Sequence, residues 1–138
     1  MAKYLLDTNH ASPLVTTGHP LRARFKEHLE LGDEFFIAAP ALTELWFGFW
    51  HTPRSRSNRA EWEQLETVIG IFKIDANDAK TAASLRYLLQ RKGNDLQVID
   101  SLIAAVAIRF EITLLTTDHD FLPVPGLKTE NWIKRPPR

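Results

Sequence analysis

The sequence contains no cysteine. Disulfide bonds, thiolate zinc sites and thiol nucleophiles are therefore excluded, and stability must come from a hydrophobic core. The lack of cysteine suits a reducing cytoplasm, where we expect the protein to act. No apolar run approaches the roughly 20 residues that a membrane span needs, and residues 1–7 lack the pattern of a signal peptide. We therefore expect a soluble protein without a membrane partner.

An excess of charge of one sign is also lacking, since 17 Lys and Arg residues balance 17 Asp and Glu residues. Net charge therefore does not indicate binding to nucleic acid or to a membrane, and any such binding must come from local patches. The length of 138 residues suits one domain, and 44% hydrophobic residues exclude a disordered or fibrous chain. We expect a single domain over residues 1–138, with its core at about 3–133 and a basic tail at 134–138.

Hydrophobic periodicity predicts strands that alternate with helices. Short apolar runs predict buried strands at 4–6, 35–38, 71–74 and 112–115, and a weaker strand within 126–133. Apolar side chains at helical spacing predict helices at 20–31, 40–50, 62–69, 78–91 and 97–110. The last of these is apolar on nearly every face, which predicts a central helix. This alternation indicates an α/β protein with a mainly parallel sheet and helices on both faces, in which ligands bind beyond the carboxyl ends of the strands.

Acidic side chains follow several of these predicted strands. Asp7 follows the first strand, Asp118 follows the fourth, and Glu44 lies in the helix after the second. Asp100 lies within an otherwise apolar helix, where a lone buried carboxylate is costly. Carboxylates that converge at one edge of a sheet repel one another, so a bound divalent cation is the simplest compensating charge. Mg²⁺ and Mn²⁺ prefer carboxylate oxygens and water, which makes this edge a candidate metal site.

Each of these acids also has an ordinary structural interpretation. Asp7 could cap a helix, and Asp100 could cap the helix that it begins. Glu44 could be a solvated acid stabilised by the helix dipole, and Asp118 could belong to a turn. Only their joint placement at one predicted edge favours a functional site over these alternatives.

Four segments carry a resemblance to a known family. They are LLDTN at 5–9, TELWFG at 43–48, GNDLQVIDSLIAA at 93–105 and LLTTDHDF at 114–121. In this order and at these separations, over about residues 3–133, the chain resembles a PIN-domain nuclease of the kind found as VapC-type toxins. The approach to the third acid, Gly93-Asn94-Asp95-Leu96, departs mildly from the family's Gly-x-x-Ile pattern. The fourth acid is Asp118, where many relatives carry a polar, non-acidic residue.

The resemblance implies a PIN-like three-layer α/β/α sandwich. It implies an endoribonuclease that depends on Mg²⁺, for which Mn²⁺ can substitute, and that leaves 3′-hydroxyl and 5′-phosphate ends. It also implies the toxin of a toxin–antitoxin pair, a homodimer, and an antitoxin whose segment occupies the acidic pocket. The family's acidic residues map onto Asp7, Glu44, Asp100 and Asp118, with Asp120 as a frequent additional acid.

Metal chemistry suggests a role for each of these side chains. Asp7 and Asp100 are expected to share the principal ion, and Asp118 and Asp120 to complete its ligand shell or hold a second ion. Glu44 is expected to orient the attacking water or to bind the ion through water. The hydroxyls of Thr8, Thr116 and Thr117 are candidates to support the carboxylates, although each also suits a strand end or a helix cap. His119 is expected to face solvent or substrate, since the carboxylates already account for a hard-cation site.

Two further segments concern binding. The predicted loop at 51–60 carries Arg54, Arg56 and Arg59, which suit contact with an RNA backbone and also suit a solvated loop. The aromatic residues at 46–50 are expected to divide between the core and a protein interface. Other functions stay open on the sequence alone: a metal-dependent DNA nuclease or phosphatase, or a non-catalytic protein-binding module.

Overall fold

A five-stranded parallel sheet forms the centre of the computed structural model, which describes residues 1–133. The strand order is β3-β2-β1-β4-β5, and every neighbouring pair is parallel. The strands are β1 (Lys3–Leu6), β2 (Glu34–Ala38), β3 (Ile69–Phe72), β4 (Thr113–Leu115) and β5 (Thr129–Glu130). The predicted basic tail, residues 134–138, lies outside the described residues.

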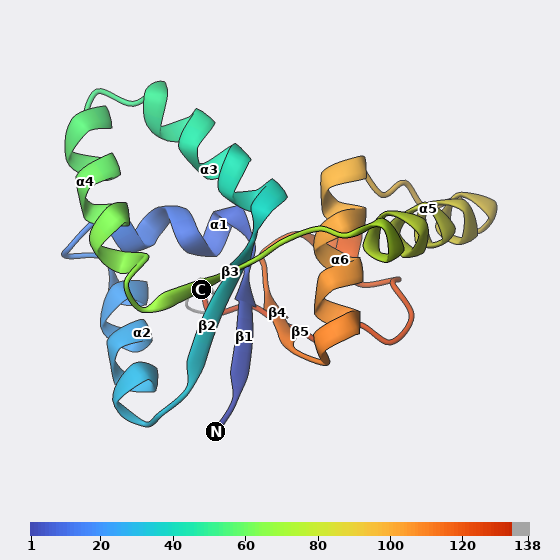
Figure 1. The fold of residues 1–138 in the computed structure, drawn as a ribbon, viewed down its shortest axis with the longest axis horizontal. Helices are drawn as coiled ribbons and strands as arrows, with labels where there is room; N and C mark the ends of the chain where they lie inside the picture. The colour runs from blue at the N-terminus through green and yellow to red at the C-terminus, as the bar shows by residue number, and fades with distance from the viewer. Residues whose placement is uncertain (134–138) are drawn as a thin grey trace, which may run out of the picture.

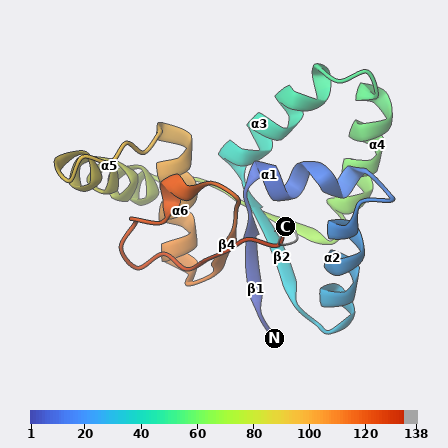
Figure 2. The ribbon, with the colours of Figure 1, turned by 180° about the vertical axis from the view of Figure 1, so that it is seen from behind.

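Helices cover both faces of this sheet. They are α1 (Thr8–Ala11), α2 (Pro20–Glu30), α3 (Ala39–Trp50), α4 (Ser55–Leu65), α5 (Ala76–Arg91) and α6 (Val98–Phe110), with 3₁₀ turns η1 (Ser12–Val15) and η2 (His119–Phe121). Figures 1 and 2 show α2 and α4 on one side of the sheet and α5 and α6 on the other. The predicted α/β/α sandwich with a parallel sheet is therefore confirmed. Within residues 1–133, no helix combines the length and the apolar character that crossing a membrane requires.

The core lies between the sheet and its two helical layers. Leu5 and Leu114 on neighbouring central strands, and Ile103 on α6, are completely buried. Helix α6 buries an almost continuous run of side chains from Ile103 to Ala107. This confirms the prediction of a central helix and explains why its sequence has no polar face, because a helix covered on most sides gains stability from apolar groups all round.

The largest differences from the predicted boundaries concern α4 and β3. The predicted loop at 51–60 is wrong from residue 55 onward, because α4 begins at Ser55 and the polar side chains of 55–60 form its solvated first turns before Trp62 packs into the core. The helix ends at Leu65 rather than continuing to 69, and the third strand is 69–72 rather than 71–74. Ile69 belongs to this strand because it pairs with Phe35 of β2.

Two short elements also differ from the predictions. The strand within 126–133 is only Thr129–Glu130, and the four-residue helix α1 was not predicted. Neither is long enough to produce a hydrophobic period in the sequence. Pairing with β4 specifies the first, and the Asp7 cap helps to specify the second.

Gly70 is expected to be required in β3. A Cβ atom added there would lie 2.6 Å from Cδ1 of Phe36, whose ring stacks on Phe72 at 4.5 Å between centroids. Gly70→Ala should therefore lower the free energy of unfolding by about 1–3 kcal/mol, as overpacking does, in a urea titration. Gly48→Ala is the matched control, since nothing lies within 4 Å of its added Cβ. This exposed helical change should instead stabilise by roughly 0.5–1 kcal/mol, and equal effects of the two changes would contradict the steric explanation.

Candidate active site

The candidate site lies at the carboxyl edge of the sheet, at the point where successive strands stop adding to one side of β1 and begin adding to the other. From β1 the chain proceeds to β2 and β3 on one side, whereas β4 pairs with the other side of β1. Asp7 directly follows β1 and Asp118 lies three residues beyond β4. The backbone N–H of Asp7 donates to the carbonyl oxygen of Leu115 at 3.0 Å, which ties the two strand ends together. Such a switch point is where parallel α/β sheets bind ligands.

Asp7 is held by three hydrogen bonds. Its Oδ1 accepts from the backbone N–H of Thr8 at 2.9 Å, and its Oδ2 accepts from the side chains of Asn9 at 3.0 Å and Thr116 at 2.7 Å. The bond from Thr8 makes Asp7 the cap of α1, so the capping interpretation is correct for this residue. Burial nevertheless raises the pKa of Asp7 above its ordinary value, opposed by these hydrogen bonds and reinforced by the charge of Asp118. A buried, oriented carboxylate therefore faces its neighbours with fixed geometry.

Asp100 is the most perturbed acid of the site. It lies in the first turn of α6 and does not cap it, because the cap residue is Gln97, which makes no side-chain capping bond. Burial raises the pKa of Asp100 to about 7, and the negative charges of four other acids add to the effect in the order Asp7, Asp118, Glu44 and Asp120. The four other predicted acids are thus near enough to Asp100 for their charges to act on it. We call these five residues the acidic cluster.

Glu44 and Asp118 contribute to the acidic cluster from different elements. Glu44 extends from α3, where burial and the charge of Asp7 raise its pKa, and its Oε1 accepts from the hydroxyl of Thr8 at 3.4 Å. Oδ1 of Asp118 accepts from the backbone N–H of Asp120 at 2.8 Å, so Asp118 also caps the 3₁₀ turn η2. Asp118 therefore has the predicted role in a turn and also belongs to the acidic cluster. His119, which lies between Asp118 and Asp120 in the sequence, is exposed.

The threonines at these strand ends act in different ways. Thr116 is buried, and its hydroxyl donates to Asp7 while accepting from the backbone N–H of Asp118 at 3.0 Å. It therefore links two members of the acidic cluster. Thr117 contributes its backbone N–H, which donates to Oδ1 of Asn9 at 3.1 Å.

The chemistry and charge of the cluster fit a hard divalent cation. Within residues 1–133, no Lys or Arg forms an ion pair with any member of the cluster; the ion pairs there involve the acids Asp33, Glu34, Glu61, Asp75 and Asp78. In the same part of the chain, no three Asp, Glu or His side chains converge closely enough to form a ready-made metal site. The donors are all carboxylate oxygens, which Mg²⁺ and Mn²⁺ prefer, and within residues 1–133 no ion pair with Lys or Arg compensates their mutual repulsion.

Sequence reasoning did not identify Asn9 and His10 as site residues. The amide of Asn9 donates to Asp7 and to the hydroxyl of Thr116 at 3.4 Å, and His10 contacts Asn9 at 2.7 Å. The only signal in the sequence is their position: Asn9 is the last residue of the LLDTN segment and His10 directly follows it. This position does not reveal which groups the two side chains contact.

The three arginines lie at the outer end of α3 rather than beside the cluster. Figure 1 shows α3 leading from the edge of the sheet out to α4, which begins just after Arg54. Arg54 and Arg56 are exposed. The guanidinium of Arg59 lies 3.9 Å from the ring centroid of Trp50, a cation–π contact. Of the aromatic segment, Phe49 enters the core and Trp46 packs against it, whereas Phe47 and Trp50 are exposed.

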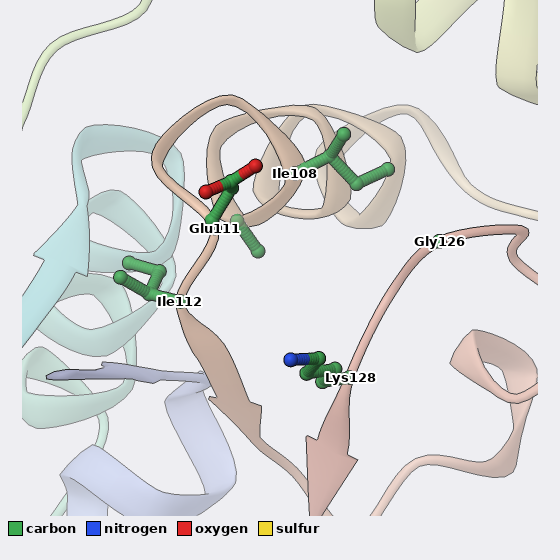
Figure 3. Close-up of a pocket in the computed structure, with 6 residues that line it drawn as sticks. Ile108, Glu111, Ile112, Gly126 and Lys128 are labelled. Carbon is green, nitrogen blue, oxygen red and sulfur yellow. The ribbon is translucent and has the colours of Figure 1, made fainter. Parts of the chain in front are cut away.

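A surface cavity of about 400 Å³ lies apart from the acidic cluster (Figure 3). Its lining includes Ile108, Glu111 and Lys128, from the carboxyl end of α6 and the segment before β5. Asp100 lies at the other end of α6, roughly 10 to 16 Å along the helix axis from the lining residues of this helix and its cap. This cavity is therefore distinct from the acidic cluster.

The α/β/α sandwich, with carboxylates at the carboxyl edge of its parallel sheet, fits the PIN-like fold that the four sequence segments imply. The family model described as PIN domain matches residues 4–127, so the chain belongs to the PIN domain family. The resemblance that the four sequence segments indicate is confirmed.

Known relatives match the chain over nearly its whole length. Ribonuclease VapC2 of Rickettsia felis is 29% identical over 135 residues, which cover 95% of this chain and 98% of the relative. A chain in the crystal structure of VapBC2 from Rickettsia felis bound to a promoter DNA fragment has a TM-score of 0.83 and 26% identity, covering 94% of this chain and 98% of that one. A chain of DNA-bound VapBC from Salmonella typhimurium has a TM-score of 0.81 and 25% identity, covering 96% and 99%. The chain is thus similar to VapC-type proteins in both sequence and fold.

Proposed function

We propose that this chain is a divalent-metal-dependent endoribonuclease and the toxin of a toxin–antitoxin pair. The observation that carries the proposal is the half-buried Asp100, on which the negative charges of four other acids act. Within residues 1–133, no Lys or Arg forms an ion pair with any of these five acids. The similarity to Ribonuclease VapC2 over 95% of this chain supports RNA as the substrate.

Asp7, Asp100, Asp118 and Asp120 would hold the ion. When bound, the cation supplies an activated water and stabilises the charge that develops on the phosphate. Three hydrogen bonds hold Asp7 in one orientation, so little reorganisation is needed when the ion enters. Glu44, which is exposed at the border of the cluster, orients the attacking water. Hydrolysis breaks the bond between phosphorus and the 3′ oxygen, leaving 3′-hydroxyl and 5′-phosphate ends.

Mg²⁺ is the proposed ion, with Mn²⁺ as a substitute, since both are hard cations that carboxylates bind. The proposed partners are an antitoxin, whose segment occupies the acidic cluster, and a second copy of this chain. Support for the antitoxin comes from the two solved relatives described above, which are both VapBC structures. Cytoplasmic RNA is the substrate class that this assignment implies.

The decisive test is an incubation of the purified protein with total cellular RNA in Mg²⁺ or in EDTA, followed by chemical analysis of the fragment ends. We expect cleavage in Mg²⁺ alone, with 3′-hydroxyl and 5′-phosphate ends. Parallel incubations with DNA and a small phosphoester distinguish the other enzyme classes. Cleavage of DNA but not RNA would contradict the substrate assignment, and the absence of saturable Mn²⁺ uptake in calorimetry would favour the non-catalytic module.

The arginines at the start of α4 are proposed to contact the RNA backbone. Replacing Arg54 and Arg56 by glutamine should weaken RNA binding without changing the maximal cleavage rate, because both residues are exposed and lie where α3 has ended and α4 begins. If each contacts one phosphate, the slope of log affinity against log salt should fall by roughly 1.4 for single-stranded RNA, measured by fluorescence anisotropy. Lys80→Gln on α5 is the control, and an equal loss there would indicate non-specific electrostatics.

A further inference from the structure

His10 is a buried histidine whose two ring nitrogens are both hydrogen-bonded. The backbone N–H of Trp132 donates to its Nε2 at 3.0 Å. Because Nε2 accepts that bond, the ring proton of the neutral imidazole is on Nδ1, which donates to Oδ1 of Asn9 at 2.7 Å. Burial, reinforced by the charge of Arg24, lowers the pKa of His10 to about 4, which agrees with a neutral ring.

Asn9 transmits this contact to the acidic cluster. Its Oδ1 accepts from both His10 and the backbone N–H of Thr117, so the oxygen of the amide faces these two donors. The amide NH₂ is consequently turned toward Oδ2 of Asp7, to which it donates at 3.0 Å. The orientation of the Asn9 amide thus determines whether Asp7 faces a donor or an acceptor.

We infer that His10 is a positioning residue of the candidate active site, which acts through Asn9 to hold the Asp7 carboxylate in the orientation that binds the cation. The inference rests on the proposed function, in which Asp7 is a metal ligand. Residues that do not touch the metal but hold its ligands in position commonly lower metal affinity or activity by 10- to 100-fold when they are replaced. The competing interpretation is purely structural, with His10 serving only to attach the segment that follows β5 through Trp132.

Three substitutions separate these interpretations, because the two ring nitrogens can be replaced independently. His10→Asn places an amide near the position of Nδ1, so it retains a donor for Asn9 and loses the acceptor for Trp132. His10→Gln reaches the position of Nε2, so it retains the acceptor and loses the donor. His10→Leu removes both groups while keeping the site filled with apolar atoms.

The readout is the Mn²⁺ dissociation constant from calorimetry, alongside the rate of RNA cleavage and the melting temperature of each folded variant. We expect His10→Asn to stay within about threefold of the wild-type affinity, and His10→Gln and His10→Leu to bind Mn²⁺ at least about 10-fold more weakly. Wild-type affinity in His10→Gln would overturn the inference, since the attachment to Trp132 would then be all that matters. A loss in His10→Asn equal to that in His10→Leu would overturn it as well.

A double-mutant cycle with Asn9→Ala provides a second measurement. In that background the path from His10 to Asp7 is interrupted, so adding His10→Leu should cause no further loss of Mn²⁺ affinity. A further 10-fold loss would overturn the inference. The proposed function fails separately, if the wild-type protein neither takes up Mn²⁺ nor cleaves RNA in its presence. Wild-type uptake with unchanged affinity in all three His10 variants refutes only the positioning role.

Discussion

Asp100→Asn is expected to reduce RNA cleavage by roughly 1000-fold or more while leaving the fold intact. In the proposed site, Asp100 is a ligand of the cation whose charge stabilises the transition state. Metal catalysis is worth several kcal/mol, and each 1.36 kcal/mol is a factor of ten in rate. The substitution keeps the size of the side chain but removes the negative charge on which the other acids of the cluster act. Single-turnover cleavage of RNA in saturating Mg²⁺ measures the effect.

The matched control for this experiment is Asp95→Asn. Asp95 is an exposed acid five residues earlier, whose Oδ2 accepts from the side chain of Gln97 at 3.0 Å. Its substitution removes the same charge from the same segment, outside the acidic cluster, and should leave cleavage within about twofold of wild type. Full activity in Asp100→Asn would remove this residue from the metal site. Equal losses in both variants would point to a general electrostatic effect on RNA binding.

The second large effect is a pH-dependent gain in stability of Asp100→Asn over the wild type in the absence of metal. The pKa of Asp100 rises from 3.8 to about 7 on folding, so between these pH values the folded state binds more protons than the unfolded state. Stability contributed by this group therefore falls as the pH rises through that window. The asparagine variant lacks this contribution, so its advantage should grow from near zero at about pH 4 to its full size above about pH 7.

Comparing the wild type with Asp100→Asn separates the effect of Asp100 from the effects of other groups whose pKa changes on folding. Asp7 and Glu44 also have raised pKa values, whereas the lowered pKa of His10 acts in the opposite direction, and these contributions largely cancel in the difference. Urea midpoints at several pH values measure that difference. Mn²⁺ should reverse it by stabilising the wild type, by about 2.7 kcal/mol at a concentration 100 times the dissociation constant. A difference that is independent of pH would contradict the placement of Asp100 among like charges.

The fold class and four members of the acidic cluster were predictable because their signals are local, whereas Asp120 was implied by the resemblance to the family. Apolar runs mark β1, β2 and β4, and the absence of a polar face in α6 marks it as central. Asp7 and Asp118 were recognisable because each follows such a run. The start of α4 was missed because its first turns are solvated and carry no apolar period before Trp62.

The support of the site was not predictable, because it depends on contacts between distant segments. In the sequence His10 is an isolated histidine. In the structure its hydrogen-bond partners are Asn9 beside it and the backbone of Trp132, 122 residues away. Thr116 likewise bonds to Asp7 across 109 residues. Nothing in the spacing of these residues indicates that β4 pairs with β1 and brings them together.

The sequence by itself determined the alternation of the main strands and helices and the position of each acid along the chain, because hydrophobic period and residue type are properties of short segments. Only the tertiary structure decided that β4 lies beside β1, that Asp100 faces the other acids instead of capping its helix, and that Asn9 and His10 hold Asp7. The physical reason is that burial and Coulomb repulsion depend on distance in space. These two effects shift the pKa of Asp100, and they arise only when segments far apart in the chain pack against one another.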